Sequence, residues 1–117
     1  MTLRSLEVLP FNVGWPTRVP STDACYQTSL ADGVAETVLV PAGARFVKLA
    51  GTKDFYSAYG STAVAATLAS TDATVGNGTE LLPYSKGEHW RFLGSTIAAV
   101  SVISSSAQTV TAEFFKE

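Results

Sequence analysis

Residues 97–115, IAAVSVISSSAQTVTAEFF, contain the pattern that decides the fold class. The side chains of a β-strand point alternately to its two faces, so a strand with one buried face alternates apolar and polar residues. In 108–115 the apolar positions are Val110, Ala112 and Phe114, and the polar positions between them are Thr109, Thr111 and Glu113. This alternation predicts a strand in a sheet with one buried and one solvated side.

A strand is also expected just before it, because in 97–103 Val100 and Val102 alternate with Ser101. The connection SSSA (104–107) is short and polar, so we predict that these two strands pair as an antiparallel hairpin. A further hairpin is predicted where GTKD (51–54) joins two runs that carry aromatic residues. The segment VPAGA (40–44) predicts a turn, since proline presets φ and glycine accepts a positive φ.

The rest of the chain repeats this pattern of short β-prone runs separated by Gly, Pro, Asn, Asp and Ser. The clearest runs are 36–40, 45–51, 54–60, 88–94, 97–103 and 108–115, and weaker ones are 3–10 and 25–30. Six to eight short strands predict an all-β protein, an antiparallel β-sandwich or jelly roll.

Two segments do not fit regular strands. Residues 10–23, PFNVGWPTRVPSTD, contain three prolines, which cannot donate ladder hydrogen bonds, so an extended arm or long loop is expected there. Residues 61–83 are small, polar and turn-rich, and predict either a short helix at 64–70 or a long connection. We therefore expect an N-terminal strand and arm in 1–24 and a single β-sandwich domain in 25–117.

Composition excludes several kinds of partner. Charged residues make up 15% of the chain, against roughly 25% in soluble domains, so we expect other chains to cover part of the surface. The net charge is -2 and no Lys/Arg cluster occurs, so no direct nucleic-acid partner is expected. The apolar runs are too short for a membrane helix, and Glu7 and Pro10 interrupt the place of a signal peptide, so we expect synthesis in a cytoplasm.

The chain lacks the residue clusters that chemistry requires. It has one histidine, His89, and one cysteine, Cys25, and its four aspartates are isolated, so neither a zinc nor a calcium site is expected. No G-x-S-x-G elbow is present, and GNG (76–78) precedes no lysine of a phosphate loop. We predict a protein that is not an enzyme and binds no metal or cofactor, with Cys25 a small buried apolar residue.

The stretch YSKGEHWRF (84–92) nevertheless places the histidine between Glu88 and Trp90. On a strand these neighbours point to opposite faces, so Glu88 cannot orient His89 as in a catalytic triad. His89 and Arg91 are expected on one face with Leu93, which leaves the histidine exposed or interfacial. Trp90 and Phe92 share the other face and suit a core or a subunit seam. A glycosidase pair of Glu80 and Glu88 stays open, because the loop between them predicts no particular distance.

Exposed aromatic residues offer another function. Tyr56, Tyr59, Tyr84 and Trp90 would form a sugar-binding platform if they lay together on one surface of a small sandwich. The alternative is that they fill the core or subunit contacts, with the tyrosine hydroxyls reaching the rim.

Three segments together resemble the small accessory structural proteins of tailed-phage virions. They are SLADGVAETVLVPAGARFVKLAGTKDFYSAYG, GNGTELLPY and WRFLGSTIAAVSVISSSAQTVTAEFF, and the resemblance covers roughly 30–115. The resemblance is one of style and segment order. It implies a sandwich or jelly-roll subunit, oligomeric and often trimeric, that decorates or cements the capsid by binding the major capsid protein. It implies no catalytic residue.

Composition and resemblance lead to the same expectation, a virion structural protein whose work is to bury surface against its partners. A tail, fibre or head-tail connector component and a receptor- or sugar-binding module remain the alternatives. The candidate interface residues are Trp15, Tyr56, Tyr59, Tyr84 and Trp90. Trp15, in the Pro-rich arm outside the resemblance, is either an anchor for a partner or a plug for its own sandwich.

Overall fold

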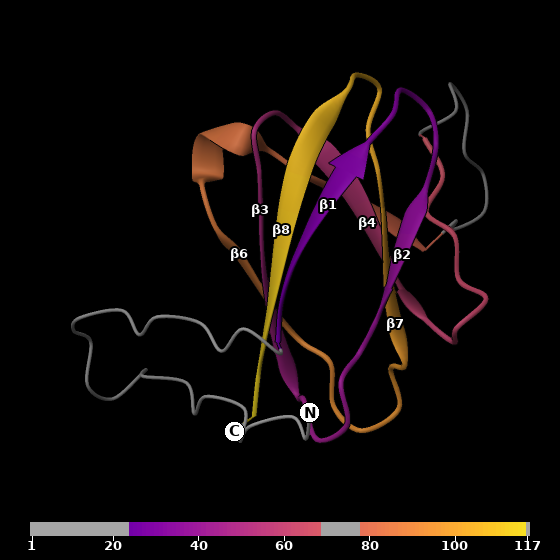
Figure 1. Ribbon diagram of the computed structural model, residues 1–117, viewed down its shortest axis with the longest axis vertical. Coiled ribbons are helices and arrows are strands. Elements are labelled where there is room, and N and C mark those ends of the chain that lie inside the picture. Colours follow the sequence, from indigo (N-terminus) through magenta and orange to yellow (C-terminus); the bar gives the residue numbers. More distant parts are fainter. Residues whose placement is uncertain (1–23, 69–77, 117) are drawn as a thin grey trace.

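The computed structural model describes residues 24–68 and 78–116, which form two four-stranded antiparallel sheets packed face to face (Figure 1). The strands are β1 (Cys25–Leu30), β2 (Glu36–Leu39), β3 (Phe46–Gly51), β4 (Phe55–Gly60), β5 (Thr79–Leu82), β6 (His89–Phe92), β7 (Ala99–Ile103) and β8 (Gln108–Phe115), with a 3₁₀ turn, η1 (Tyr84–Lys86). One sheet has the order β1-β8-β3-β6 and the other β2-β7-β4-β5. The predicted sandwich is confirmed.

The pairing of the strands is nested. β4 pairs with β5, β3 with β6, β2 with β7 and β1 with β8, as in one long antiparallel hairpin folded over on itself. The additional pairs β3–β8 and β4–β7 complete the two sheets. This connectivity is that of a jelly roll, in which most connections cross from one sheet to the other.

Both predicted hairpins are therefore wrong. The connection 104–107 leads from β7 in one sheet to β8 in the other, and 51–54 likewise leads from β3 to β4. Alternation indicates which face of a strand is buried, but two strands that face each other across a core show the same pattern as two neighbours in one sheet. The turn at 40–44 is confirmed, with Gly43 at φ 85° and Ala44 N–H donating to the Pro41 carbonyl.

The two crossing connections lie together and are joined by Gln108. Its Nε2 donates to the Asp54 carbonyl at 2.7 Å and to Ser104 Oγ at 2.8 Å, and its Oε1 accepts from Lys53 N–H at 3.1 Å. A side chain at Gly51 would force Gln108 or Phe55 to shift, because a Cβ there would lie 2.6 Å from Gln108 Oε1.

The core lies between the inner faces of the sheets. It includes Val38, Val47, Leu49, Phe55, Leu82, Val100, Val102, Val110 and Phe114, all buried. The alternation predicted for β8 places Val110, Ala112 and Phe114 inward as expected. Its outer face is not simply solvated, however, because Glu113 and Phe115 are also buried.

The strands predicted most clearly all occur within two residues of their expected ends, and the weaker run 25–30 is β1. The run 3–10, the arm and Trp15 lie outside the described residues. In 61–83 no helix forms over 64–68, whereas Thr79–Leu82 is a strand that the sequence analysis missed.

Candidate functional site

The described candidate interface residues lie on different surfaces. Tyr56 packs in a small cluster on the outer face of β4, whereas Tyr59 points into the sandwich and is partly buried. Tyr84 is on η1, and Trp90 is on the outer face of β6, in the other sheet. The structure thus does not gather these aromatic rings into one sugar platform.

The predicted alternation in 88–93 is confirmed, but the environment of His89 was predicted incorrectly. His89 is 7% exposed, and it packs edge-to-face against Phe55 in the core. Its Nε2 lies 2.9 Å from the Pro83 carbonyl oxygen, so this nitrogen carries the proton and donates it. With Nε2 bound to the backbone, His89 holds the start of β6 against the end of β5.

Glu80 and Glu88, the pair considered for glycoside hydrolysis, do not converge on one site. Glu80 pairs with Arg91, whereas Glu88 pairs with Lys48 at 3.2 Å on the outer face of the sheet. The two carboxylates therefore belong to different surfaces, and no arrangement of acid and nucleophile results.

The main polar group within the sandwich is a cluster of Tyr59, Glu80 and Arg91, from β4, β5 and β6. Arg91 binds Glu80 through two nitrogens, Nε to Oε2 at 2.7 Å and Nη2 to Oε1 at 2.8 Å. The Tyr59 hydroxyl donates to Glu80 Oε2 at 2.9 Å and lies 2.7 Å from Ser57 Oγ. We call these three residues the edge brace, because they join the sheets where β5 and β6 form their edges.

The electrostatics of the edge brace hold each group in one charge state. The hydrogen bond from Arg91 lowers the pKa of Glu80, and the same contact raises the pKa of Arg91. Burial raises the pKa of Tyr59 well above its ordinary value. All three pKa values are shifted away from neutral pH, so these groups are better suited to a structural cross-link than to proton transfer.

Three large apolar side chains are exposed on β5, on β6 and on the 3₁₀ turn between these strands. Leu81 of β5 is 48% exposed, Tyr84 of η1 is 58% exposed and Phe92 of β6 is 64% exposed. β5 and β6 are each one of the two edge strands of their sheet, the others being β2 and β1, so backbone donors and acceptors are also presented here. We call this surface the β5–β6 edge, and sequence alternation alone did not indicate it because the edge strands were unknown.

A second unusual surface is the outer face of β8, β3 and β6, which we call the aromatic face. It contains the rings of Phe46, Trp90, Phe92 and Phe115. The centroids of Trp90 and Phe115 are 5.3 Å apart, and those of Phe46 and Phe92 are 5.0 Å apart. Trp90 and Phe92 therefore belong to an outer face, with Phe92 at its margin on the edge strand, and not to the core.

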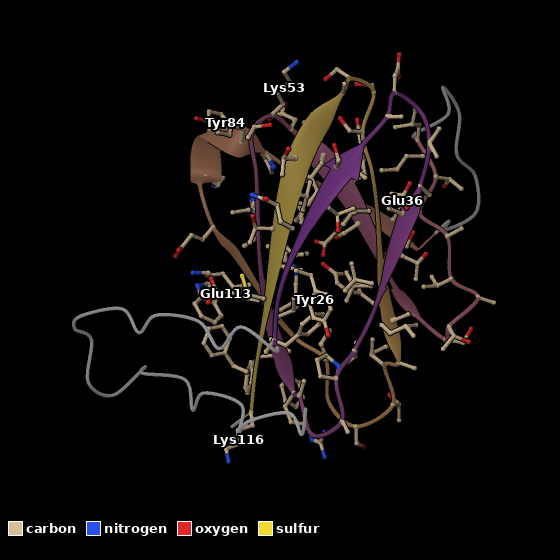
Figure 2. All side chains as sticks on the ribbon, viewed as in Figure 1. Tyr26, Glu36, Lys53, Tyr84, Glu113 and Lys116 are labelled. Carbon is tan, nitrogen blue, oxygen red and sulfur yellow. The ribbon has the colours of Figure 1, made fainter. Side chains whose placement is uncertain are left out.

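Beside these rings lies an ion pair. Lys48 Nζ is 2.8 Å from Glu113 Oε1 and 5.9 Å from the centre of the Trp90 ring. Figure 2 shows Glu113 on the outer side of β8, whereas Tyr26 points to the space between the sheets. The pKa of Lys48 is raised, since its bonds to the two carboxylates outweigh the opposite effect of burial.

Cys25 lies next to this pair, opposite Glu113 in the β1–β8 register. It is half-buried on the outer face, and not in the core as predicted. Burial, and then the neighbouring Glu113 carboxylate, raise the pKa of its thiol, so little thiolate forms at neutral pH.

Within 24–68 and 78–116, no group of three or more His, Cys, Asp or Glu side chains is placed to hold a metal ion. In the same part of the chain, no helix has the length and apolar character needed to cross a bilayer. Comparisons of the chain with models of protein families, with curated proteins and with solved structures found no match.

Proposed function

We propose that the protein is a structural subunit that works without catalysis and contacts other protein chains through the β5–β6 edge. The observation that carries the proposal is the exposure of Leu81, Tyr84 and Phe92 around two strand edges. Large exposed apolar side chains and open strand edges are both typical of surfaces that other chains cover. The edge brace joins β5 to β6 through the two bonds between Glu80 and Arg91 and so holds the two strands together, which lowers the entropy that binding costs.

The assembly that we propose is a tailed-phage capsid, where the subunit decorates or cements the lattice by binding the major capsid protein. This part rests on the sequence resemblance over 30–115 and on the low charge content. Jelly rolls occur in capsid proteins and also in lectins, so the fold alone does not choose between them. In this role the subunit is a homo-oligomer, with a trimer favoured, and each contact raises the free energy needed to open the lattice.

The first experiment measures the mass of the full chain in solution by light scattering over a range of concentrations. We expect an oligomer, and we expect Leu81→Ser or Phe92→Ser to shift it toward single subunits, because each removes apolar contact area at the interface. Val34→Ser is the matched control, since Val34 is exposed but lies in the turn between β1 and β2. If the wild type stays a monomer, or the edge variants keep the oligomer mass, the β5–β6 edge is not the subunit contact.

The second experiment adds labelled protein to phage heads that lack a decoration protein and images them. Saturable binding over the whole lattice supports cementing, whereas binding at one vertex or along the tail indicates a connector or tail component. Binding to a glycan array that Trp90→Ala abolishes would instead indicate a sugar-binding module.

A further inference from the structure

The edge strands of the two sheets differ in how well they are protected against an added strand. An edge strand presents unpaired backbone groups, and proteins guard it by keeping it short or by pointing a charged side chain inward. β2, β5 and β6 have four residues each. Glu80 and Arg91 point inward from β5 and β6 as the edge brace, and Glu36 of β2 lies opposite the core residue Val102. Strand addition is therefore hindered at these three edges.

β1, the remaining edge strand, has neither protection. It is six residues long, and its sequence CYQTSL contains no charged residue and no proline. Three of its side chains, those of Tyr26, Gln27 and Ser29, are exposed. Among the described residues its ladder neighbour is β8, which lies beside it in Figure 1. β1 is therefore the edge that is most open to pairing with another strand.

The hydrogen bonds between β1 and β8 show which backbone groups of β1 point outward. Phe114 N–H donates to the Ala24 carbonyl at 2.9 Å, and these two residues continue the β1–β8 register. Hydrogen-bonded and non-hydrogen-bonded pairs alternate along an antiparallel ladder, so every second residue after Ala24 also bonds to β8. The N–H and C=O groups of Cys25, Gln27 and Ser29 consequently point away from β8, toward the open edge.

We propose that β1 pairs with β1 of a second copy of this chain, antiparallel and centred on Gln27. A two-fold axis at Gln27 places Cys25 opposite the partner's Ser29. These are the residues whose backbone groups point outward, so each opposed pair exchanges both of its hydrogen bonds. Tyr26 then lies opposite the partner's Thr28, and an aromatic residue facing a β-branched one is a stabilising cross-strand pair.

Two features of β1 select a second copy as the occupant. Its outward residues are spaced evenly about Gln27, so two copies in this register leave none of these backbone groups over, whereas a shifted register leaves some unpaired. β1 is also uncharged, so two copies place no like charges opposite each other, as two copies of β2, β5 or β6 would. The sheet β1-β8-β3-β6 then continues across the axis into the same sheet of the partner.

This contact is separate from the β5–β6 edge, because β1 and β6 are at opposite ends of their sheet. At the β5–β6 edge the inward charges leave the contact to exposed side chains, whereas at β1 the backbone makes it. One strand pair is a small interface, so it is weak by itself. We expect it at millimolar protein concentration, or wherever another contact already holds two copies together.

The test is an isotope-filtered NOE spectrum of a millimolar mixture of ¹³C-labelled and unlabelled full chains. Opposed residues of a non-hydrogen-bonded pair have Cα atoms about 4.5 Å apart, whereas residues two apart on one strand are separated by roughly 6.6 Å. We expect an NOE between Hα of Tyr26 in one copy and Hα of Thr28 in the other. The absence of this NOE would overturn the proposal.

Substitutions at Gln27 test the register. Gln27→Lys alone and Gln27→Glu alone place like charges opposite each other on the axis, so each should weaken the NOE between copies severalfold. An equal mixture of the two variants places opposite charges across the axis and should restore the NOE, which also shows that both variants are folded. An NOE that persists undiminished in either variant alone, or that the mixture does not restore, would contradict pairing centred on Gln27.

Two control variants separate this contact from the others. Thr62→Lys adds the same charge at an exposed position after β4 and should leave the NOE unchanged. Phe92→Ser, which removes apolar area at the β5–β6 edge, should also leave it unchanged, so the two contacts can fail independently. A loss of the NOE in Thr62→Lys would mean that added charge acts generally, and would contradict the role given to β1.

Discussion

Replacing Gln108 by alanine should destabilise the fold, and by more than the same replacement of Gln27, the other glutamine of the chain. Gln108 is 7% exposed and makes three hydrogen bonds that join the 51–54 and 104–107 connections. Each such bond contributes about 1 kcal/mol. Water can replace the partners at Lys53 and Asp54, because both residues are exposed, so we expect a loss of about 2 kcal/mol in the free energy of unfolding.

The assay is urea denaturation monitored by tryptophan fluorescence, with thermal unfolding as a second measure. A loss of this size should lower the midpoint concentration at an unchanged m-value, and should lower Tm by roughly 10 °C. Gln27→Ala is the matched control, because Gln27 is exposed on β1 in the same sheet, and its loss should stay below about 0.5 kcal/mol.

Gln108→Met separates packing from hydrogen bonding, since methionine fills a similar volume without donors or acceptors. We expect Gln108→Met to lose most of the stability that Gln108→Ala loses, because the hydrogen bonds dominate. If Gln108→Ala costs no more than Gln27→Ala, the side chain does not join the two connections as described. If only Gln108→Met is well tolerated, packing of the side chain beside Gly51 is its main contribution.

The edge brace leads to two further predictions. Tyr59→Phe removes the hydroxyl between Ser57 and Glu80 and should lower the free energy of unfolding, measured by urea denaturation, by about 1–2 kcal/mol. Tyr84→Phe, at an exposed position, is the control and should leave the free energy of unfolding unchanged. Equal losses in the two variants would contradict the role given to Tyr59. The pKa of Glu80 is lowered in the folded protein, so its contribution to stability is complete above the unfolded pKa of about 4.3 and is lost as the pH falls through the folded pKa. The difference in the free energy of unfolding between wild type and Glu80→Gln should therefore shrink at acid pH. It should be at most about 1 kcal/mol, because the pair of Glu80 and Arg91 is partly exposed. A difference that grew toward low pH would refute the stabilising role given to the ionised Glu80.

Prediction from the sequence succeeded where a local pattern has one physical meaning. Alternation placed Val110 and Phe114 inward and separated His89 from Trp90, because the direction of a side chain on a strand depends only on its position. The turn at 40–44 was also predicted, since proline and glycine set the backbone locally. β5 was missed because only four residues of a turn-rich stretch form it.

The candidate site was less predictable, because its residues come from separate strands. Glu80 and Arg91 were each visible in the sequence, but their salt bridge depends on β5 and β6 meeting at one edge of the sandwich. An inward-pointing arginine on a strand was the available signal, since a charge within a sandwich requires a partner. The aromatic face could not be seen for the same reason, as Phe115 and Trp90 are joined only through the β8–β3–β6 order.

The sequence by itself determined seven of the eight described strands, the alternation of inward and outward residues along them and the scarcity of groups for catalysis, because these depend on residue type and on a period of two. Only the tertiary structure decided which strands pair. The pattern of a strand records that one of its faces is buried but not what lies against that face, so β7 and β8 look like hairpin partners although they belong to opposite sheets. The nested pairing of the jelly roll then determines which charges meet and which apolar side chains remain outside, and these are the features on which the proposed function rests.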